Sequence, residues 1–223
     1  MLDLTQTIAT LVLDHSEIAP VLQRHRLDFC CRGNVTLDVA CAERGLDADV
    51  VAAELNRAVA ARATGHLTTD PRSLSTPRLV AHIIAQYHEP LRTVLPFLQG
   101  LSAKVARVHG DHNARLRPLG TAVAQLATIL PVHLDVEENT LFPALVSPAP
   151  ERAVVETELR AMHTDHLAVG ELLRIVRAES EDFTSPEWAC NSYRTLMTEL
   201  LALETAILAH VHLENHVLMP RFM

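Results

Sequence analysis

The chain has 223 residues, of which 48% are hydrophobic and only 4% aromatic, with 7 glycines. That length suits one large domain, or one medium domain with a small companion. The hydrophobic content excludes an intrinsically disordered chain. Scarce glycine together with abundant Ala and Leu predicts an all-α protein, because Ala and Leu are strong helix formers and glycine weakens helices.

The formal net charge is −8, and the sequence contains a single lysine, Lys104. No basic stripe is present in the sequence, so we expect no nucleic-acid partner. No apolar run reaches the length of a membrane span, so we expect no membrane association either. Residues 1–4 carry no signal-peptide pattern, which favours a cytoplasmic protein. The 4 cysteines are then expected to be reduced, reactive or metal-binding.

The sequence pattern of residues 1–65 predicts a small helical N-terminal domain built from short helices. A turn at residues 28–34 contains Cys30 and Cys31. Residues 66–76 are rich in Thr, Ser, Gly and Pro without a period, which indicates a linker. The expected short helices lie near residues 8–12, 16–25, 36–45 and 47–61.

Residues 77–223 show four long helical patterns joined by short connections. Thr76-Pro77 and Ser185-Pro186 each place a capping residue before a proline, which is typical of a helix start. Short connections favour antiparallel neighbours, so we expect an up-down-up-down four-helix bundle. The predicted helices are residues 77–107, 113–146, 151–179 and 186–219, with prolines 90, 96 and 131 inside the patterns.

The second and fourth of these helices share one motif. His133-Leu-Asp-Val-Glu137-Glu-Asn-Thr-Leu-Phe-Pro143 and His210-Val-His-Leu-Glu214-Asn-His-Val-Leu-Met-Pro220 both read HxxxExxxLxP. Residues at i and i+4 lie on the same helix face, one turn apart. The duplicated string therefore indicates two equivalent helices that present a histidine and a glutamate together.

The spacing of apolar residues places these histidines and glutamates on the core face of each helix. The predicted stripes run through Leu126, Leu130, His133, Glu137 and Leu141, and through Leu203, Ile207, His210, Glu214 and Val217. The first helix adds His88 in the stripe Ala81, Ile84, His88, Leu91 and Leu95, and the third adds His166 in the stripe Leu159, Met162, His166, Val169 and Leu173.

Two buried carboxylates would repel one another, and a cation between them removes that cost. Imidazole and carboxylate ligands suit iron, manganese or zinc, and bundle cores are known to hold di-metal sites. The set fits two non-haem iron ions bridged by carboxylates, with open positions for a small ligand or an oxo bridge. The predicted metal ligands are His88, His133, Glu137, His166, His210 and Glu214.

The remaining histidines and cysteines receive other predictions. We expect His82 to be structural or beside the ligands, His163 at the site edge, His109 and His112 solvated in a turn, and His212 and His216 facing outward or covering the site. Asp135, Glu138 and Asp165 are candidates for orienting imidazoles. Arg32 beside Cys30-Cys31 would lower a thiol pKa, with an ordinary packed thiol as the alternative. Cys41 and Cys190 are expected to be buried small hydrophobes.

These residues together resemble the RIC family (repair of iron centres), the di-iron iron–sulfur cluster repair proteins of the YtfE/ScdA/NorA type. The resemblance is carried by the HxxxE…LFP string, Tyr87-His88, Glu171-Leu172-Leu173 after His166, Leu213-Glu214-Asn215 and Asp28-Phe29-Cys30-Cys31. Oxygen-carrying hemerythrins typically show HxxxH and HxxxxD instead, and Arg32, His163, His212, His216 and Pro131 depart from the family pattern.

The resemblance implies a hemerythrin-like bundle with a di-iron centre and a cytoplasmic role in the response to nitrosative and oxidative stress. It implies binding of nitric oxide or dioxygen, a supply of iron to damaged iron–sulfur client proteins, and the same six ligands. Cys30 and Cys31 would then assist iron transfer or redox chemistry. The alternatives are an enzyme that reduces nitric oxide at the two irons, and an oxygen or redox sensor. The chain is expected to be a monomer or a homodimer.

Overall fold

A computed structural model describes residues 2–61 and 70–223 of the chain. The chain divides into two compact units, residues 1–74 with 211–221 and residues 75–210 with 222–223. The last long helix passes from the second unit into the first. The end of the predicted N-terminal domain at residue 65 and the start of the predicted linker lie outside the described residues.

The first unit contains short helices, as the sequence predicts. Thr7 caps the first of them, because its hydroxyl accepts a hydrogen bond from the Thr10 N–H. Gly45 ends the third with φ 65°, a left-handed conformation that glycine adopts without a Cβ penalty. The helices are α1 (Ile8–Asp14), a 3₁₀ turn (Ser16–Ile18), α2 (Ala19–Arg24), α3 (Leu37–Arg44) and α4 (Ala48–Ala61).

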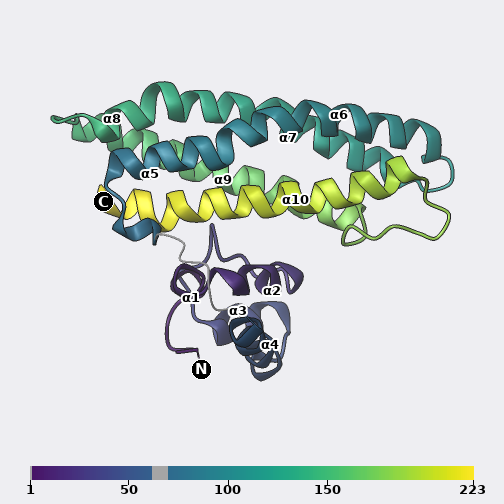
Figure 1. Cartoon of the computed structure of the whole chain (residues 1–223), viewed down its shortest axis with the longest axis horizontal. Helices are drawn as coiled ribbons and strands as arrows, with labels where there is room; N and C mark the ends of the chain where they lie inside the picture. Colours follow the sequence, from purple (N-terminus) through teal and green to yellow (C-terminus); the bar gives the residue numbers. More distant parts are fainter. Residues whose placement is uncertain (1, 62–69) are drawn as a thin grey trace. The chain divides into compact units, whose positions relative to one another are not determined.

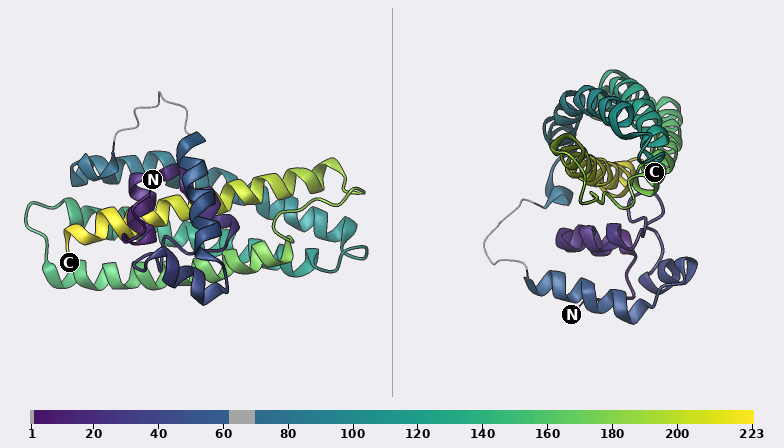
Figure 2. Two further views of the ribbon diagram at one scale, coloured as in Figure 1. Left: turned by 90° about the horizontal axis from the view of Figure 1, so that it is seen from below. Right: turned by 90° about the vertical axis from the view of Figure 1, so that its right-hand side faces the viewer.

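The second unit is built from long helices that run alongside one another (Figure 1), and the end-on view in Figure 2 shows them arranged around a common axis. Within the described residues the regular elements are helical, so the all-α prediction is confirmed. The α-helices after residue 75 are α5 (Thr76–Ile83), α6 (Glu89–His109), α7 (Leu116–Val136), α8 (Phe142–Val146), α9 (Arg152–Glu179) and α10 (Asn191–Leu213).

The predicted start of the last helix is wrong by five residues. Helix α10 begins at Asn191, not at Pro186. The Pro186 carbonyl accepts a hydrogen bond from the Ala189 N–H 3.0 Å away, which closes a turn and not a helical start. The Ser185-Pro186 pair therefore marks this turn, and the helix begins after the turn has ended.

The predicted core stripes agree with the structure in three helices and shift in the first. Ala81 is exposed, and Ile83 is buried in place of Ile84. His88 nevertheless stays fully buried, because a wider π-helical turn over Ile84–His88 brings a residue five positions after Ile83 onto the same helix face.

Two helical stretches, Leu116–Val146 and Asn191–Arg221, are long and apolar enough to cross a membrane by length and composition alone. The sequence expectation that no segment reaches this length is wrong on that measure. Both stretches are bundle helices, and core helices of soluble proteins have the same property. Both also carry buried histidine and glutamate side chains, which a bilayer core would accept only at high cost.

A buried ion pair joins α9 to α10 away from the predicted metal ligands. The Arg177 Nε donates to Glu204 Oε1 at 2.9 Å, and both side chains are buried. The same guanidinium donates to Asp182 and lies 4.8 Å from the centroid of the Phe183 ring. Glu181, Asp182 and Phe183 have φ values of 51°, 55° and 60°, so Arg177 holds a left-handed turn that non-glycine residues rarely adopt.

Glu204→Leu should strongly destabilise the bundle, because it removes the buried carboxylate that pairs with the Arg177 guanidinium. Loss of one partner of a buried pair costs about 3–5 kcal/mol, and a matched apolar replacement of both partners is often neutral. Denaturation followed by circular dichroism should show a large loss for Glu204→Leu and a substantial recovery for Arg177→Met/Glu204→Leu. The exposed pair Arg174–Glu171 supplies the control, and Arg174→Ala should change little.

Candidate metal centre

Three of the four bundle helices change to a π-helical turn where a predicted ligand lies. One π turn ends at His88, a second begins at Glu137 and a third begins at Glu214. Such single turns are rare in proteins and are frequent at functional sites. The turns span Ile84–His88, Glu137–Leu141 and Glu214–Leu218.

Proline explains the position of each π turn. The residue just after each turn is followed directly by a proline: Pro90, Pro143 or Pro220. Proline lacks an N–H, and its ring clashes with the carbonyl four residues earlier. The preceding N–H instead bonds the carbonyl five residues back, as Phe142 N–H does with the Glu137 carbonyl. The final proline of the repeated motif therefore sets the backbone that carries each glutamate.

The structure brings all six predicted ligands together in two groups. In each group, one donor atom per residue lies within 4.8 Å of the others. All six residues are buried. The groups are His88, Glu137, His210 and Glu214, and His133, Glu137, His166 and Glu214.

The grouping settles a pairing that the sequence leaves open. His88 belongs with His210, and their Nε2 atoms are 3.3 Å apart. His133 belongs with His166, whose rings meet edge to face with centroids 5.1 Å apart. Each half of the centre thus takes one histidine from an HxxxE helix and one from a helix without the motif. Both glutamates are common to the two halves.

Glu137 presents one carboxylate oxygen to each half. Its Oε2 lies 3.5 Å from His88 Nε2 and 3.9 Å from His210 Nε2. Its Oε1 lies 3.2 Å from His133 Nε2 and 3.7 Å from His166 Nε2. A carboxylate in this orientation can bridge two cations, with one oxygen on each.

The donor set has the chemistry of a metal centre. Imidazole nitrogens and carboxylate oxygens are ligands for iron, manganese and zinc, and a soft thiolate is not among the six. Two carboxylates in an apolar core repel each other, and divalent cations between them would offset both that repulsion and the cost of burial. The residues present therefore fit a pair of cations.

A carboxylate fixes the tautomer of His88. The His88 Nδ1 donates to Glu138 Oε1 at 2.9 Å, which leaves the lone pair on Nε2, the atom that faces Glu137. Arg92 donates to the same Glu138 oxygen at 3.1 Å and also contacts Asp135. Glu138 thus has the orienting role that the sequence predicts, whereas Asp135 contacts Arg92 and not an imidazole.

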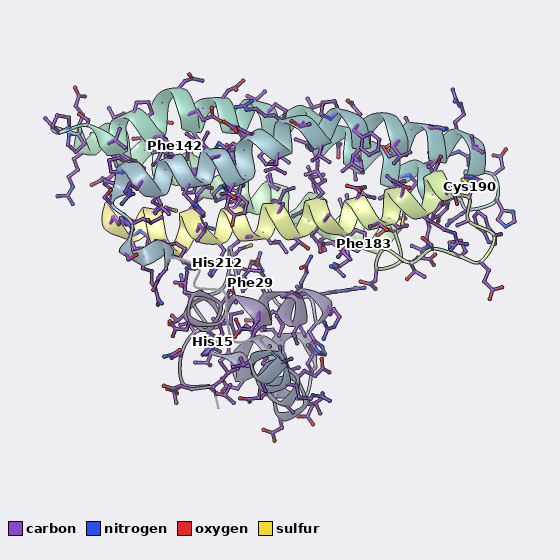
Figure 3. All side chains as sticks on the ribbon, viewed as in Figure 1. His15, Phe29, Phe142, Phe183, Cys190 and His212 are labelled. Atoms are coloured by element: carbon purple, nitrogen blue, oxygen red, sulfur yellow. The ribbon has the colours of Figure 1, made fainter. Side chains whose placement is uncertain are left out.

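The other half has a looser counterpart. Asp165 Oδ2 lies 3.4 Å from His133 Nδ1, and its side chain is 57% exposed. Aromatic rings cover the first half: Phe142, labelled in Figure 3, stacks on His88, and Tyr87 stacks on His210. These rings limit the orientations that the two imidazoles can adopt.

Of the two alternatives predicted for His212, facing outward or covering the site, the first is wrong. This residue is buried, and its Nδ1 donates to the Phe29 carbonyl at 3.2 Å (Figure 3). Burial, aided by the nearby His216, lowers the pKa of His212 to about 4. His216 Nε2 and the Asn215 side-chain amide both donate to the Cys30 carbonyl, at 2.8 and 2.9 Å. Residues 212, 215 and 216, which belong to the first unit, therefore hold the loop of the cysteine pair.

Asp28 organises that loop. Its Oδ1 accepts hydrogen bonds from the backbone N–H groups of Cys30 and Cys31 at 3.2 and 2.8 Å. The Cys30 thiol lies 3.3 Å from the same oxygen and 3.5 Å from the Cys31 sulfur. Asp28, Cys30 and Cys31 form a third group of potential metal ligands within the described residues.

The expectation that Arg32 lowers the thiol pKa is wrong for Cys30. The hydrogen bond with Cys31, burial and the Asp28 charge raise the pKa of Cys30 well above its ordinary value. Arg32 is exposed. The charge beside the Cys30 thiol is thus the Asp28 carboxylate. Cys41 is buried, as the sequence predicts, and the His82 ring meets the Tyr87 ring edge to face.

Fold and site together define a hemerythrin-like helical bundle preceded by a small helical unit. Residues 79–222 match the family described as the hemerythrin HHE cation binding domain, and residues 4–59 match ScdA_N, described as a domain of unknown function (DUF542).

Several relatives match nearly the whole chain. The iron-sulfur cluster repair protein YtfE of Yersinia pseudotuberculosis serotype O:1b (strain IP 31758) is 33% identical over 216 residues, covering 97% of this chain and 96% of the relative. The protein with the same description from Yersinia pestis (strain Pestoides F) is 32% identical over the same coverage. The chain belongs to the YtfE family of iron–sulfur cluster repair proteins, which confirms the resemblance found in the sequence.

Glu138→Gln should weaken cation binding, because it removes the carboxylate that orients His88. Loss of such an outer partner typically reduces metal affinity by about 10- to 100-fold. Asp135→Asn is the matched control, since Asp135 contacts Arg92 but not His88. Competition with a chromophoric chelator gives both affinities. Equal affinities in the two variants would contradict the orienting role of Glu138.

Proposed function

We propose that the chain is a cytoplasmic non-haem di-iron protein that acts in the repair of damaged iron–sulfur clusters during nitrosative and oxidative stress. The observation that carries this proposal is the sharing of Glu137 and Glu214 by two groups of histidines. Relatives described as iron–sulfur cluster repair proteins support the repair role. The proposed ligands are His88, His133, Glu137, His166, His210 and Glu214.

Iron is the cation that best accounts for both the ligand set and the proposed repair role. Two irons would supply redox chemistry and open coordination positions for nitric oxide or dioxygen, and they would also be the iron supplied to a client protein. The chain's own residues hold the ions, orient the imidazoles through Glu138 and Asp165, and surround the centre with apolar side chains. Carboxylate ligands shared between two ions can change their binding mode without a change of fold.

The cysteine pair would receive or pass on an iron ion. Asp28, Cys30 and Cys31 offer two sulfurs and a carboxylate oxygen within 4.8 Å of one another, a set that can bind a metal ion. A bound cation would also offset the negative charge of the Asp28 carboxylate, which lies 3.3 Å from the Cys30 sulfur. His216 and Asn215, on the helix of His210 and Glu214, hold this loop by its backbone. The proposed recipients are iron–sulfur client proteins.

A second candidate is reduction of nitric oxide at the two irons. The geometry of Glu137 favours it, because a bridging carboxylate would hold two metal ions side by side. Two nitric oxide molecules with two electrons and two protons give one nitrous oxide and one water. Nitrous oxide formed over many turnovers with an added reductant, under anaerobic conditions, would establish this activity, whereas stoichiometric binding would exclude it.

Removal of either shared carboxylate should empty the centre. Anaerobically purified protein should contain about two irons per chain, as other di-iron bundles do, together with oxo-bridge absorption after exposure to air. Glu137→Ala and Glu214→Ala should each lose both signals, while Glu156→Ala, at a half-exposed position that pairs with Arg152, should keep them. Zinc alone in the wild-type protein, or iron retained in the two variants, would contradict the proposal.

The proposed role of the cysteines can be tested separately from iron binding. Cys30→Ser/Cys31→Ser should keep its iron content, because neither thiol belongs to the six ligands. It should lose the ability to restore activity to an enzyme whose four-iron cluster has been damaged by nitric oxide. Cys41→Ala removes a buried thiol in the same unit and serves as the control. Unimpaired repair by the double variant would remove the cysteines from the mechanism.

A further inference from the structure

A second cluster of reactive side chains lies far from the six metal ligands. His109 is the last residue of α6, and Cys190 immediately precedes α10; Figure 3 labels Cys190 where that helix begins. His109 follows His88 by 21 residues, a helical distance of about 30 Å at 1.5 Å per residue. The Cys190 sulfur is 3.2 Å from His109 Nε2.

The structure contradicts both sequence expectations for these residues. Cys190 is exposed, not a buried small hydrophobe, because α10 begins only after it. His109 is half-buried and packed, not a solvated turn residue. Its ring lies 5.8 Å from the Trp188 ring and 5.9 Å from the Tyr193 ring, centroid to centroid. The Trp188 and Tyr193 rings thus hold the imidazole beside the thiol.

The two helix ends favour opposite charges on this pair. The Cys190 carbonyl accepts a hydrogen bond from the Arg194 N–H at 3.0 Å, so Cys190 occupies the N-terminal cap of a 23-residue helix. Helix N-termini stabilise thiolates. His109 lies at the C-terminus of a 21-residue helix, where a positive charge is stabilised. A proton moved from Cys190 to His109 therefore leaves each charge at the helix end that favours it.

The other charged groups near the pair carry both signs. The Lys104 amine lies 3.5 Å from the Ser192 hydroxyl, two residues after Cys190. The Arg194 guanidinium donates to the Ala189 carbonyl, one residue before it, and to the Glu187 carbonyl. On the acidic side, Glu187 lies in the preceding turn, and the Glu181 charge acts on Tyr193. His112 packs on Trp188, with ring centroids 4.3 Å apart.

We propose that Cys190 and His109 form a nucleophilic thiol site that reacts with small disulfides, independently of the metal centre. His109 takes the proton from the Cys190 thiol. The thiolate attacks one sulfur of the disulfide, a new sulfur–sulfur bond forms, and the original one breaks. His109 returns the proton to the departing thiolate. The products are Cys190 as a mixed disulfide and one free small thiol, so the disulfide is the only oxidant required.

The other cysteines are poorly suited to this reaction. Cys30 is buried, and its hydrogen bond with Cys31 together with burial raises its thiol pKa. Cys41 is also buried, and burial raises its pKa too. Cys31 is half-buried beside Cys30. Cys190 alone among the four combines exposure with an imidazole at hydrogen-bond distance.

The test is the rate of mixed-disulfide formation at each cysteine. Full-length protein is treated with oxidised glutathione, quenched with acid, digested and analysed by mass spectrometry. At neutral pH, Cys190 should react about tenfold faster than Cys31, as expected for a thiol activated by a neighbouring base. His109→Gln should slow Cys190 to the rate of Cys31, and the difference from wild type should vanish at alkaline pH, where thiols ionise unaided.

His112→Gln is the matched control, because it removes an imidazole that packs on the same Trp188 but contacts no thiol at hydrogen-bond distance; it should keep the fast rate. Cys190→Ser should lose the fast phase of glutathione incorporation and retain its iron content. Equal rates at Cys190 and Cys31, or an unchanged Cys190 rate in His109→Gln, would overturn the proposal. Loss of the fast rate at every pH in His109→Gln would assign His109 a packing role only and would overturn it as well.

Discussion

Burial of two carboxylates among four imidazoles, inside an apolar helical bundle, is the constraint on which the rest of the structure depends. Charged side chains are almost never fully buried without a partner. Here Glu137 and Glu214 are buried together with the four histidines. Cations would turn this costly arrangement into a stabilising one, because each would be attracted to both carboxylates. We therefore expect the folding of the bundle to be coupled to metal binding.

The backbone is adapted to the same constraint. In each of three helices a proline removes one backbone donor and a π turn accommodates it at the position of a ligand. The wider turn changes the angular spacing of the residues on either side. It lets a helix present its ligand to the centre while the apolar residues before the turn keep their place in the core. The helix of His166 lacks such a turn, and its buried residues follow the predicted spacing.

The sequence is sufficient to predict the bundle and the six converging side chains, because the four-residue spacing of His and Glu coincides with the spacing of the core residues. Periodicity fails where the helix itself changes. Ala81 is exposed because the π turn before His88 shifts the buried face by one residue. Cys190 is exposed because the turn at Pro186 delays the start of α10. His212 is buried by contact with the Phe29 loop, a long-range contact that no local pattern encodes.

The central claim is that two iron ions lie between the histidine groups and share both glutamates. Crystal diffraction from anaerobically purified protein, measured on either side of the iron absorption edge, tests it most directly. The account predicts two iron peaks, one beside His88 and His210 and the other beside His133 and His166, with Glu137 and Glu214 between them. A single iron peak, or a signal at the zinc edge alone, would contradict it.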